Sequence, residues 1–168
     1  AAAGAKTKPK VYKLLADANF QKGDYANAKK YVDLYFGKEK EDELIAFDYK
    51  LKADILAKTG GTPEEVLNAF IQGIDVDTVL QNKLDLAKQG LTLLKEQKRY
   101  ADQVVLLEKL LSIKPNPTIN DYFDLTIASY FSNDHAKSRA QALVMIEKYP
   151  DQVYGYEWAY NNAIAVDT

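Results

Sequence analysis

Histidine and cysteine, the residues on which many catalytic and metal sites depend, are nearly absent from this sequence. His135 is the only histidine, and the chain has no cysteine. A Ser-His-Asp triad, a thiolate nucleophile and a zinc site built from histidine and cysteine therefore lack the residues they need. His135 follows Asp134 near the expected start of a helix, and because no triad can be assembled around it we expect it to be structural or solvent-facing. The sequence predicts no catalytic residue, no metal site and no cofactor.

The carboxylates and glycines form no chemical motif either. Acidic side chains gather in KEKEDE (38–43) and PEE (63–65), and such charge runs are typical of solvated linkers and helix starts. Gly60 and Gly61 are adjacent glycines without the GxxxxGK[ST] pattern of a phosphate-binding loop. We therefore expect a protein that is not an enzyme.

Charge and hydropathy narrow the choice of partner. Lysine and arginine total 22 and aspartate and glutamate total 24, so the net charge is −2. A protein that binds nucleic acid through its phosphates needs a clear basic surplus. No apolar run approaches the ~20 residues that cross a bilayer. The expected partner is a protein or peptide, with no nucleic acid and no transmembrane segment.

Apolar spacing indicates a chain of helices joined by short connections. Val11, Leu14, Leu15 and Ala18 recur at helical spacing, and Tyr12 extends the same stripe. No segment alternates with period two, so we expect an all-α fold of about nine helices. The expected helices from the third onward cover about 44–58, 63–74, 79–97, 100–113, 119–131, 135–149 and 151–165.

Turn and capping residues separate these helices. Gly23 suits the turn after the first helix, and Asp24 can cap the second. Further N-caps are expected at Thr62, Thr118 and Asp134, the first two with a capping-box carboxylate three residues on, at Glu65 and Asp121.

The helix pairs recur at a nearly constant interval. Lys13, Lys50 and Lys88 occupy the same place in three first helices, with steps of 37 and 38 residues. Tyr25 and Tyr100 open two second helices and are 75 residues apart, which is two such steps. A two-helix unit of this length is typical of a helical-hairpin solenoid.

Two segments carry a resemblance to a known family. YKLLADANFQKGDYANAKKYVDLYF (12–36) and RYADQVVLLEKLLSIKP (99–115) resemble tetratricopeptide repeats. In the first, Ala16 and Ala28 are the small residues of the two helices, and Gly23 makes the turn. The resemblance implies a right-handed superhelical α-solenoid of antiparallel helix pairs.

The repeats are degenerate elsewhere, which leaves a looser helical repeat open. Gln103 and Ser138 replace the small residue of second helices, and Leu91 and Thr126 that of first helices. The start, AAAGAKTKPK, indicates a processed end or the beginning of a fragment. We expect a disordered end at 1–8 and a single domain at 9–168, with repeats at about 9–37, 42–75, 79–115 and 117–150 and a lone helix at 151–165.

The resemblance also implies where a partner binds. In this family the first helices line a concave groove that holds partner peptides. Lysines stand toward one end of the expected groove, and apolar and aromatic residues stand toward the other. The implied groove residues are Lys13, Asp17, Phe20, Gln21, Lys50, Asp54, Ala57, Lys88, Thr92, Lys95, Phe123, Ile127 and Tyr130.

Charges in this expected groove argue against one kind of ligand. Lys13 with Asp17, and Lys50 with Asp54, are four residues apart and can form ion pairs. The chaperone-binding members of the family grip a terminal carboxylate with lysine and asparagine. Here aspartates stand at the asparagine places, so we expect no such grip.

Twelve tyrosines are a high count for 168 residues. We expect core packing for Tyr12, Tyr25, Tyr31, Tyr100 and Tyr122. The aromatic residues near the end are too dense for one helix to bury on one face, so some of them are exposed, because the array is cut or because they bind a partner. This expected C-terminal interface comprises Tyr154, Tyr156, Trp158 and Tyr160, next to Tyr149.

The leading hypothesis is a non-enzymatic scaffold that binds a partner segment in its concave groove. Two alternatives stay open: a structural component of a larger envelope or secretion assembly, and a recruiting domain of a longer multidomain protein. The lone C-terminal helix leaves self-association open as well. The excess of lysine over arginine favours an exported bacterial protein, periplasmic or associated with the envelope, over a cytoplasmic one.

Overall fold

The computed structural model describes residues 8–166, and over that range the chain is helical with no strand. The expected disordered end therefore lies outside the described residues, apart from Lys8. A short 3-10 helix, η1 (Glu41–Glu43), lies in the charged linker. The α-helices are α1 (Pro9–Gln21), α2 (Tyr25–Phe36), α3 (Ala46–Lys58), α4 (Pro63–Val76), α5 (Leu80–Glu96), α6 (Tyr100–Ile113), α7 (Ile119–Phe131), α8 (His135–Lys148) and α9 (Val153–Val166).

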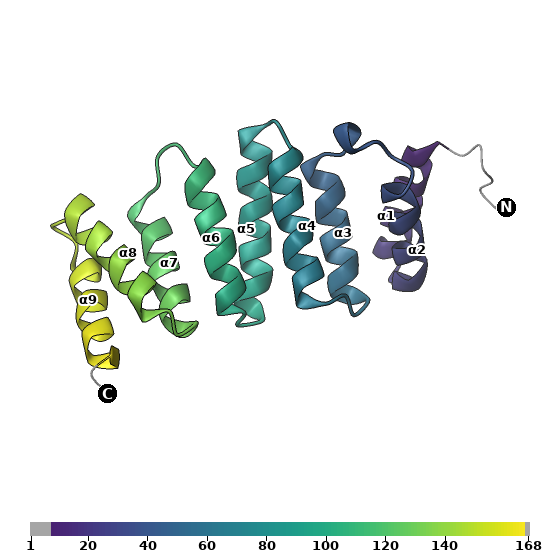
Figure 1. Cartoon of the computed structure of the whole chain (residues 1–168). Coiled ribbons are helices and arrows are strands. Elements are labelled where there is room, and N and C mark those ends of the chain that lie inside the picture. The colour runs from purple at the N-terminus through teal and green to yellow at the C-terminus, as the bar shows by residue number, and fades with distance from the viewer. Residues whose placement is uncertain (1–7, 167–168) are drawn as a thin grey trace. The chain divides into compact units, whose positions relative to one another are not determined.

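The chain divides into two compact units, 1–86 and 87–168, with the boundary inside α5. In the first unit α1 packs on α2 and α3 on α4, and in the second α7 packs on α8 and α8 on α9. Successive helices within a unit run antiparallel, as Figure 1 shows. The predicted all-α fold of antiparallel helix pairs is confirmed for the described residues.

The predicted joints are present at the helix ends. Gly23 has a φ of +77°, the left-handed conformation that favours glycine. The Asp24 carboxylate accepts from the N–H of Asn27 at 3.2 Å and so caps α2. At the start of α4, the Thr62 N–H donates to Glu65 at 2.7 Å and the Glu65 N–H donates to Thr62 Oγ1 at 3.2 Å. The capping box expected from the sequence is therefore complete.

The predicted stripe of α1 located the helix but not its buried face. Tyr12 and Ala16 are buried, whereas Val11 and Leu14 are exposed. Ala16 lies in a core cluster with Ala28 and residues of α2 and α3, so the small residues named from the repeat pattern do stand where helices approach closely. The spacing correctly predicted the helix, but apolar spacing does not tell which face of a helix meets a neighbour.

The tyrosines divide between core and surface. Tyr12 is buried as expected, but Tyr25 is exposed, and its ring lies tilted against that of Phe20 with 5.5 Å between ring centroids. Tyr35 and Tyr49, which the repeat pattern did not single out, are buried together with Tyr12. The other tyrosines expected in the core are half-buried, namely Tyr31, Tyr100 and Tyr122.

Polar residues replace the small residues of the second unit without being left unpaired. Gln103 Nε2 donates to the carbonyl oxygen of Leu94 at 3.1 Å. Ser138 Oγ donates to the carbonyl oxygen of Thr126 at 2.9 Å, and the amide of Asn162 donates to Ser138 Oγ at 2.8 Å. These bonds join neighbouring helices, so the degenerate positions contribute directed contacts where the repeat pattern has close packing.

Candidate functional site

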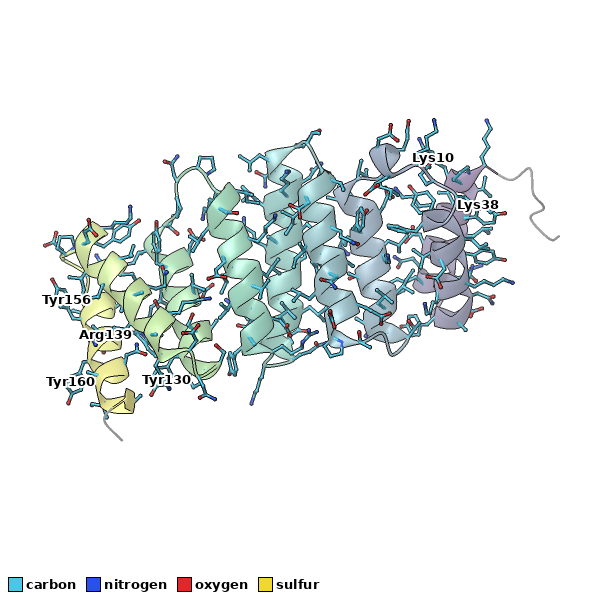
Figure 2. All side chains as sticks on the ribbon, in the orientation of Figure 1. Lys10, Lys38, Tyr130, Arg139, Tyr156 and Tyr160 are labelled. Atoms are coloured by element: carbon cyan, nitrogen blue, oxygen red, sulfur yellow. The ribbon has the colours of Figure 1, made fainter. Side chains whose placement is uncertain are left out.

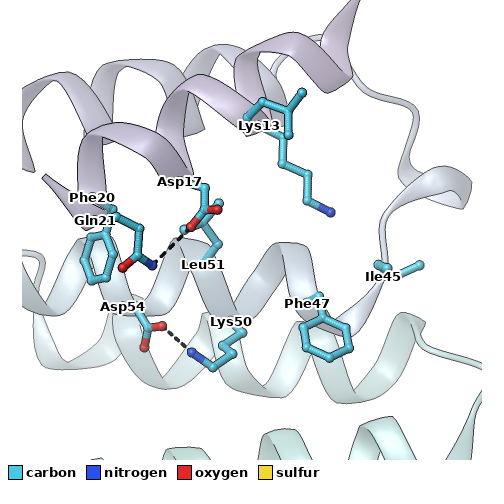
Figure 3. A pocket seen from close by; sticks show the side chains of 10 residues that line it. Lys13, Asp17, Phe20, Gln21, Ile45, Phe47, Lys50, Leu51 and Asp54 are labelled. Carbon is cyan, nitrogen blue, oxygen red and sulfur yellow. Dashed lines mark hydrogen bonds and ion pairs between the residues drawn. The ribbon is translucent and has the colours of Figure 1, made fainter.

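A pocket of about 490 Å³ opens along α1 and α3 in the first unit (Figure 3). It brings together six of the residues that the repeat pattern assigned to the groove: Lys13, Asp17, Phe20, Gln21, Lys50 and Asp54. Four further residues complete the lining: Leu14, Ile45, Phe47 and Leu51.

Helix periodicity explains why these side chains share one surface. On α1, Lys13, Asp17 and Phe20 are spaced four and three residues apart, so they lie on one face. On α3, Phe47 and Lys50 follow the same rule. Because α1 and α3 are both first helices of their pairs and contact each other, their exposed faces form the two sides of one groove.

Apart from Phe20, the apolar residues of the groove were not predicted from the sequence. Leu14 is 68% exposed and Phe47 is 59% exposed, and their position together in one groove is more informative than the exposure of either side chain alone. Ile45 is also exposed beside them. Phe47 stands three residues before Lys50, one helical turn toward the N-terminus on the same face of α3, and this spacing could have predicted it as a groove residue.

The charged side chains are held in place by pairing. Lys50 Nζ lies 2.5 Å from Asp54 Oδ2, which confirms the predicted pair. Lys13 does not pair with Asp17, which was expected from their spacing; its Nζ lies 2.5 Å from Asp48 Oδ1 on α3. Asp17 instead accepts a long hydrogen bond of 3.5 Å from Gln21.

The burial of Asp48 explains why Lys13 pairs with it and not with Asp17. Its side chain is 1% exposed, and a buried carboxylate is stable only when it is paired and hydrogen-bonded. The Ile45 N–H donates to Asp48 Oδ2 at 2.9 Å, and Lys13 supplies the opposite charge. Burial raises the pKa of the neighbouring Tyr35 phenol, and the charge of Asp48 raises it further. Lys13 therefore pairs with the buried carboxylate of Asp48 and not with the exposed one of Asp17.

Asp77 is a second buried carboxylate of the first unit that sequence reasoning missed. Its oxygens accept from the N–H groups of Ala46 at 3.0 Å and Val79 at 2.8 Å, and from the Asn82 amide. Burial alone would raise the pKa of Asp77, but these hydrogen bonds together hold it below its usual value. Asp77 thus fixes the start of α3, the helix that carries one side of the groove.

The predicted groove residues of α5 belong to the second unit. Lys88, Thr92 and Lys95 are all exposed there. Lys95 Nζ pairs with Asp124 of α7 at 2.8 Å. Ala57, at the end of α3, is half-buried and does not line the pocket.

The predicted groove residues of α7 lie largely against α9. The ring of Phe123 lies 5.1 Å from that of Tyr154 and 6.4 Å from that of Trp158. Tyr130 contacts Trp158 at 5.2 Å between centroids, and Ile127 between them is half-buried. This aromatic cluster is therefore part of the packing of α9, which covers most of the surface that α7 was expected to offer.

His135 is half-buried and its ring lies 4.8 Å from that of Tyr130. Among residues 8–165, no three histidine, cysteine or acidic side chains gather in a way that could hold a metal ion. None of the helices that the structure describes is both long and apolar enough to cross a membrane.

Comparisons with known proteins identify the fold. No protein-family model matches the sequence, and no curated protein matches it. A solved structure does match: the C-terminal part of a TPR repeat-containing protein from Cytophaga hutchinsonii, with 21% identity and a TM-score of 0.56. The match covers 97% of this chain and 61% of that one. The fold of this chain is thus that of a tetratricopeptide-like helical repeat, and the neighbour's organism fits the expectation of a bacterial protein.

Proposed function

We propose that this protein is a non-enzymatic scaffold that binds a segment of another protein in the groove of α1 and α3. The repeat fold supports the general role, because such arrays present extended surfaces to partners. The groove residues on α1 and α3 support the particular place.

The observation that carries the proposal is the pair of exposed apolar side chains, Leu14 and Phe47, on facing sides of one groove. A soluble fold gains nothing from exposing large apolar groups together, and such patches mark interaction sites. Lys13 and Lys50 are held by ion pairs with Asp48 and Asp54, so the groove is largely ordered before a ligand binds. A preordered surface loses less conformational entropy on binding.

The charges of the groove indicate the chemistry of the segment. The lining itself is balanced, with Lys13 and Lys50 against Asp17 and Asp54. Because Lys13 is neutralised by the buried Asp48 and Lys50 by Asp54, the charge of Asp17 is the one that no lysine of the groove offsets. Both lysines already have an aspartate partner. The segment that fits carries an aliphatic or aromatic anchor flanked by neutral or basic residues, whereas an acidic tail meets repulsion.

Peptide selection tests this function directly. Random dodecapeptides displayed on phage are selected on the immobilised chain, and an enriched peptide is synthesised and titrated by fluorescence anisotropy. Leu14→Ala and Phe47→Ala should each weaken its binding by about tenfold or more, the range of an anchor contact. Both side chains are exposed, so urea unfolding of the variants should match that of the parent.

The matched control is Leu143→Ala, which removes another exposed leucine, on α8. It should leave peptide affinity unchanged. If an enriched peptide binds Leu14→Ala and Phe47→Ala as well as the parent, the groove is not the binding site. Phe123→Ala is a poor test, because Phe123 packs against α9.

A charge exchange in the peptide tests the proposed ligand class. A version whose flanking lysines are replaced by glutamates should bind more weakly, and the difference should shrink as salt is added. Equal or tighter binding of the acidic version would show that the aspartates do not govern selectivity.

A further inference from the structure

The last helix, α9, is packed on one side only. Gly155 and Asn162 are buried on the side that faces α8. The helices approach so closely there that a Cβ on Gly155 would lie 2.8 Å from Ile146 Cγ1 and 2.9 Å from the Ile146 backbone nitrogen. This side of α9 is firmly seated in the second unit.

The opposite side of α9 is a continuous apolar stripe. Val153, Tyr156, Tyr160 and Ile164 are spaced three, four and four residues apart and are between 47% and 66% exposed. Helix geometry places them on one face, opposite the buried side. Figure 2 shows Tyr156 and Tyr160 pointing outward from α9.

The other helices of this unit show how such a face is normally covered. α7 has α6 and α8 as neighbours and also contacts α9, so only Asn120 and Phe131 of that helix are exposed. Each helix packs against antiparallel neighbours. The stripe of α9 is where an antiparallel helix would continue this packing, and none of the residues 8–166 provides one.

We propose that the stripe pairs with the same stripe of a second copy of this chain. The order of the four residues reads nearly the same from either end, with an aliphatic residue at each end and two tyrosines between. A twofold axis that crosses the two helices midway along the stripe, at the level of Trp158, therefore places Val153 of one copy opposite Ile164 of the other. The same axis places Tyr156 opposite Tyr160. Such self-complementarity is what an isologous interface requires, and it makes the two α9 helices antiparallel.

The area of the stripe fits a reversible dimer. Side chains of this size present on the order of 200 Å² each when fully exposed, so four of them at about half exposure offer roughly 400 to 500 Å² per copy. Two copies then bury about 1,000 Å² with their rims, which is below the ~1,200 Å² of stable interfaces and within the range of weak, transient ones. The dimer should form and dissociate with concentration.

Glu157 distinguishes this pairing from the docking of another protein. It is the only charged residue of α9, it is exposed, and it stands beside Tyr156 close to the proposed axis. In a twofold pair the two Glu157 carboxylates approach each other and repel. A foreign helix suited to this face would instead place a cation there. Removing the charge therefore has opposite effects in the two cases.

Sedimentation velocity of the whole chain over a range of concentrations tests the proposal. The parent should move from monomer to dimer as concentration rises. Tyr160→Asp should weaken association by at least about tenfold, and Glu157→Gln should strengthen it severalfold. Leu143→Asp, which changes an exposed apolar residue on α8, should leave it unchanged. Circular dichroism should show the same helix content in all variants.

Three results would overturn the proposal. The parent could stay monomeric at every concentration, or it could form a dimer that Tyr160→Asp does not weaken. Weaker association of Glu157→Gln would also exclude the twofold pair and would indicate an occupant that places a cation at this position.

Discussion

Lys13 of α1 lies 2.5 Å from the buried carboxylate of Asp48 on α3, although Asp17 is the acidic residue nearest to it along its own helix face. This ion pair joins two first helices, and it holds one lysine of the groove in place. It links the stability of the first unit to the shape of the candidate binding surface.

Asp48→Asn should lower the free energy of unfolding by about 1–3 kcal/mol, because it removes a buried charge that is both paired and hydrogen-bonded. The cost stays below that of a fully buried pair, since Lys13 is partly exposed and can turn to water. Urea unfolding followed by circular dichroism measures the effect. Asp33→Asn is the control, because it breaks an exposed pair with Lys29 and should cost less than about 1 kcal/mol. Equal losses of unfolding free energy in Asp48→Asn and Asp33→Asn would mean that burial does not strengthen the Lys13–Asp48 pair.

Asp77 should make stability depend on pH in the acid range. Its pKa in the folded chain is below its usual value, so the ionised form stabilises the fold. This contribution is complete above the unfolded pKa of about 3.9 and is lost as pH falls toward the folded pKa. Asp77→Asn should therefore be less stable than the parent at pH 7, and the difference should narrow at pH 3.

Urea unfolding at the two pH values measures this difference. Asp42→Asn, in the exposed 3-10 helix η1, should follow the parent at both. A constant difference between Asp77→Asn and the parent across this range would contradict the role of the Asp77 charge.

Gly73→Ala should destabilise the first unit although alanine is the better helix former. A Cβ at this position would lie 2.5 Å from Leu86 Cδ2 and 2.7 Å from Tyr49 Cβ. Overpacking costs about 1–3 kcal/mol and the helix propensity of alanine returns up to about 1 kcal/mol, so the net loss in the middle of this range should be about 1 kcal/mol. Thermal unfolding measures it. Gly37→Ala, whose Cβ would meet only Asp33 O at 3.2 Å, should change stability less. A Gly73→Ala variant as stable as the parent would mean that the helices separate at little cost.

Ser138 and Asn162 should be energetically coupled. Ser138 accepts from the Asn162 amide and donates to the Thr126 carbonyl oxygen, so Ser138→Ala removes one hydrogen bond to each of two other helices, while the Asn162 amide keeps its bond to the Trp158 carbonyl oxygen. Each single alanine variant should cost about 0.5–1.5 kcal/mol through its lost hydrogen bonds. A double-mutant cycle should then show a coupling of about 0.5 kcal/mol or more.

The exposed Ser112 donates only to Lys109 of its own helix, so Ser112→Ala should change stability little. Strict additivity of the Ser138 and Asn162 variants would show that α8 and α9 are held by packing alone.

The local features of this fold could be read from the sequence. Asp24, Thr62 and Asp134 were predicted as caps, and each accepts the expected backbone N–H. The helix bounds agree within a few residues. These features depend on residues three or four positions apart, whose relative placement any helix start or turn already sets. The α1 and α3 groove residues followed in the same way, since equal positions in successive repeats face the same side.

The sequence by itself thus determined the helices, their joints and the two-helix period. Only the tertiary structure decided which faces are buried and which charges meet. Lys13 pairs with Asp48, 35 residues away, and the ring of Phe123 packs against that of Tyr154. In each case the outcome depends on which helices come into contact. Burial then decides the pairing, because an unpaired charge costs much more free energy when it is buried than when it is exposed to water.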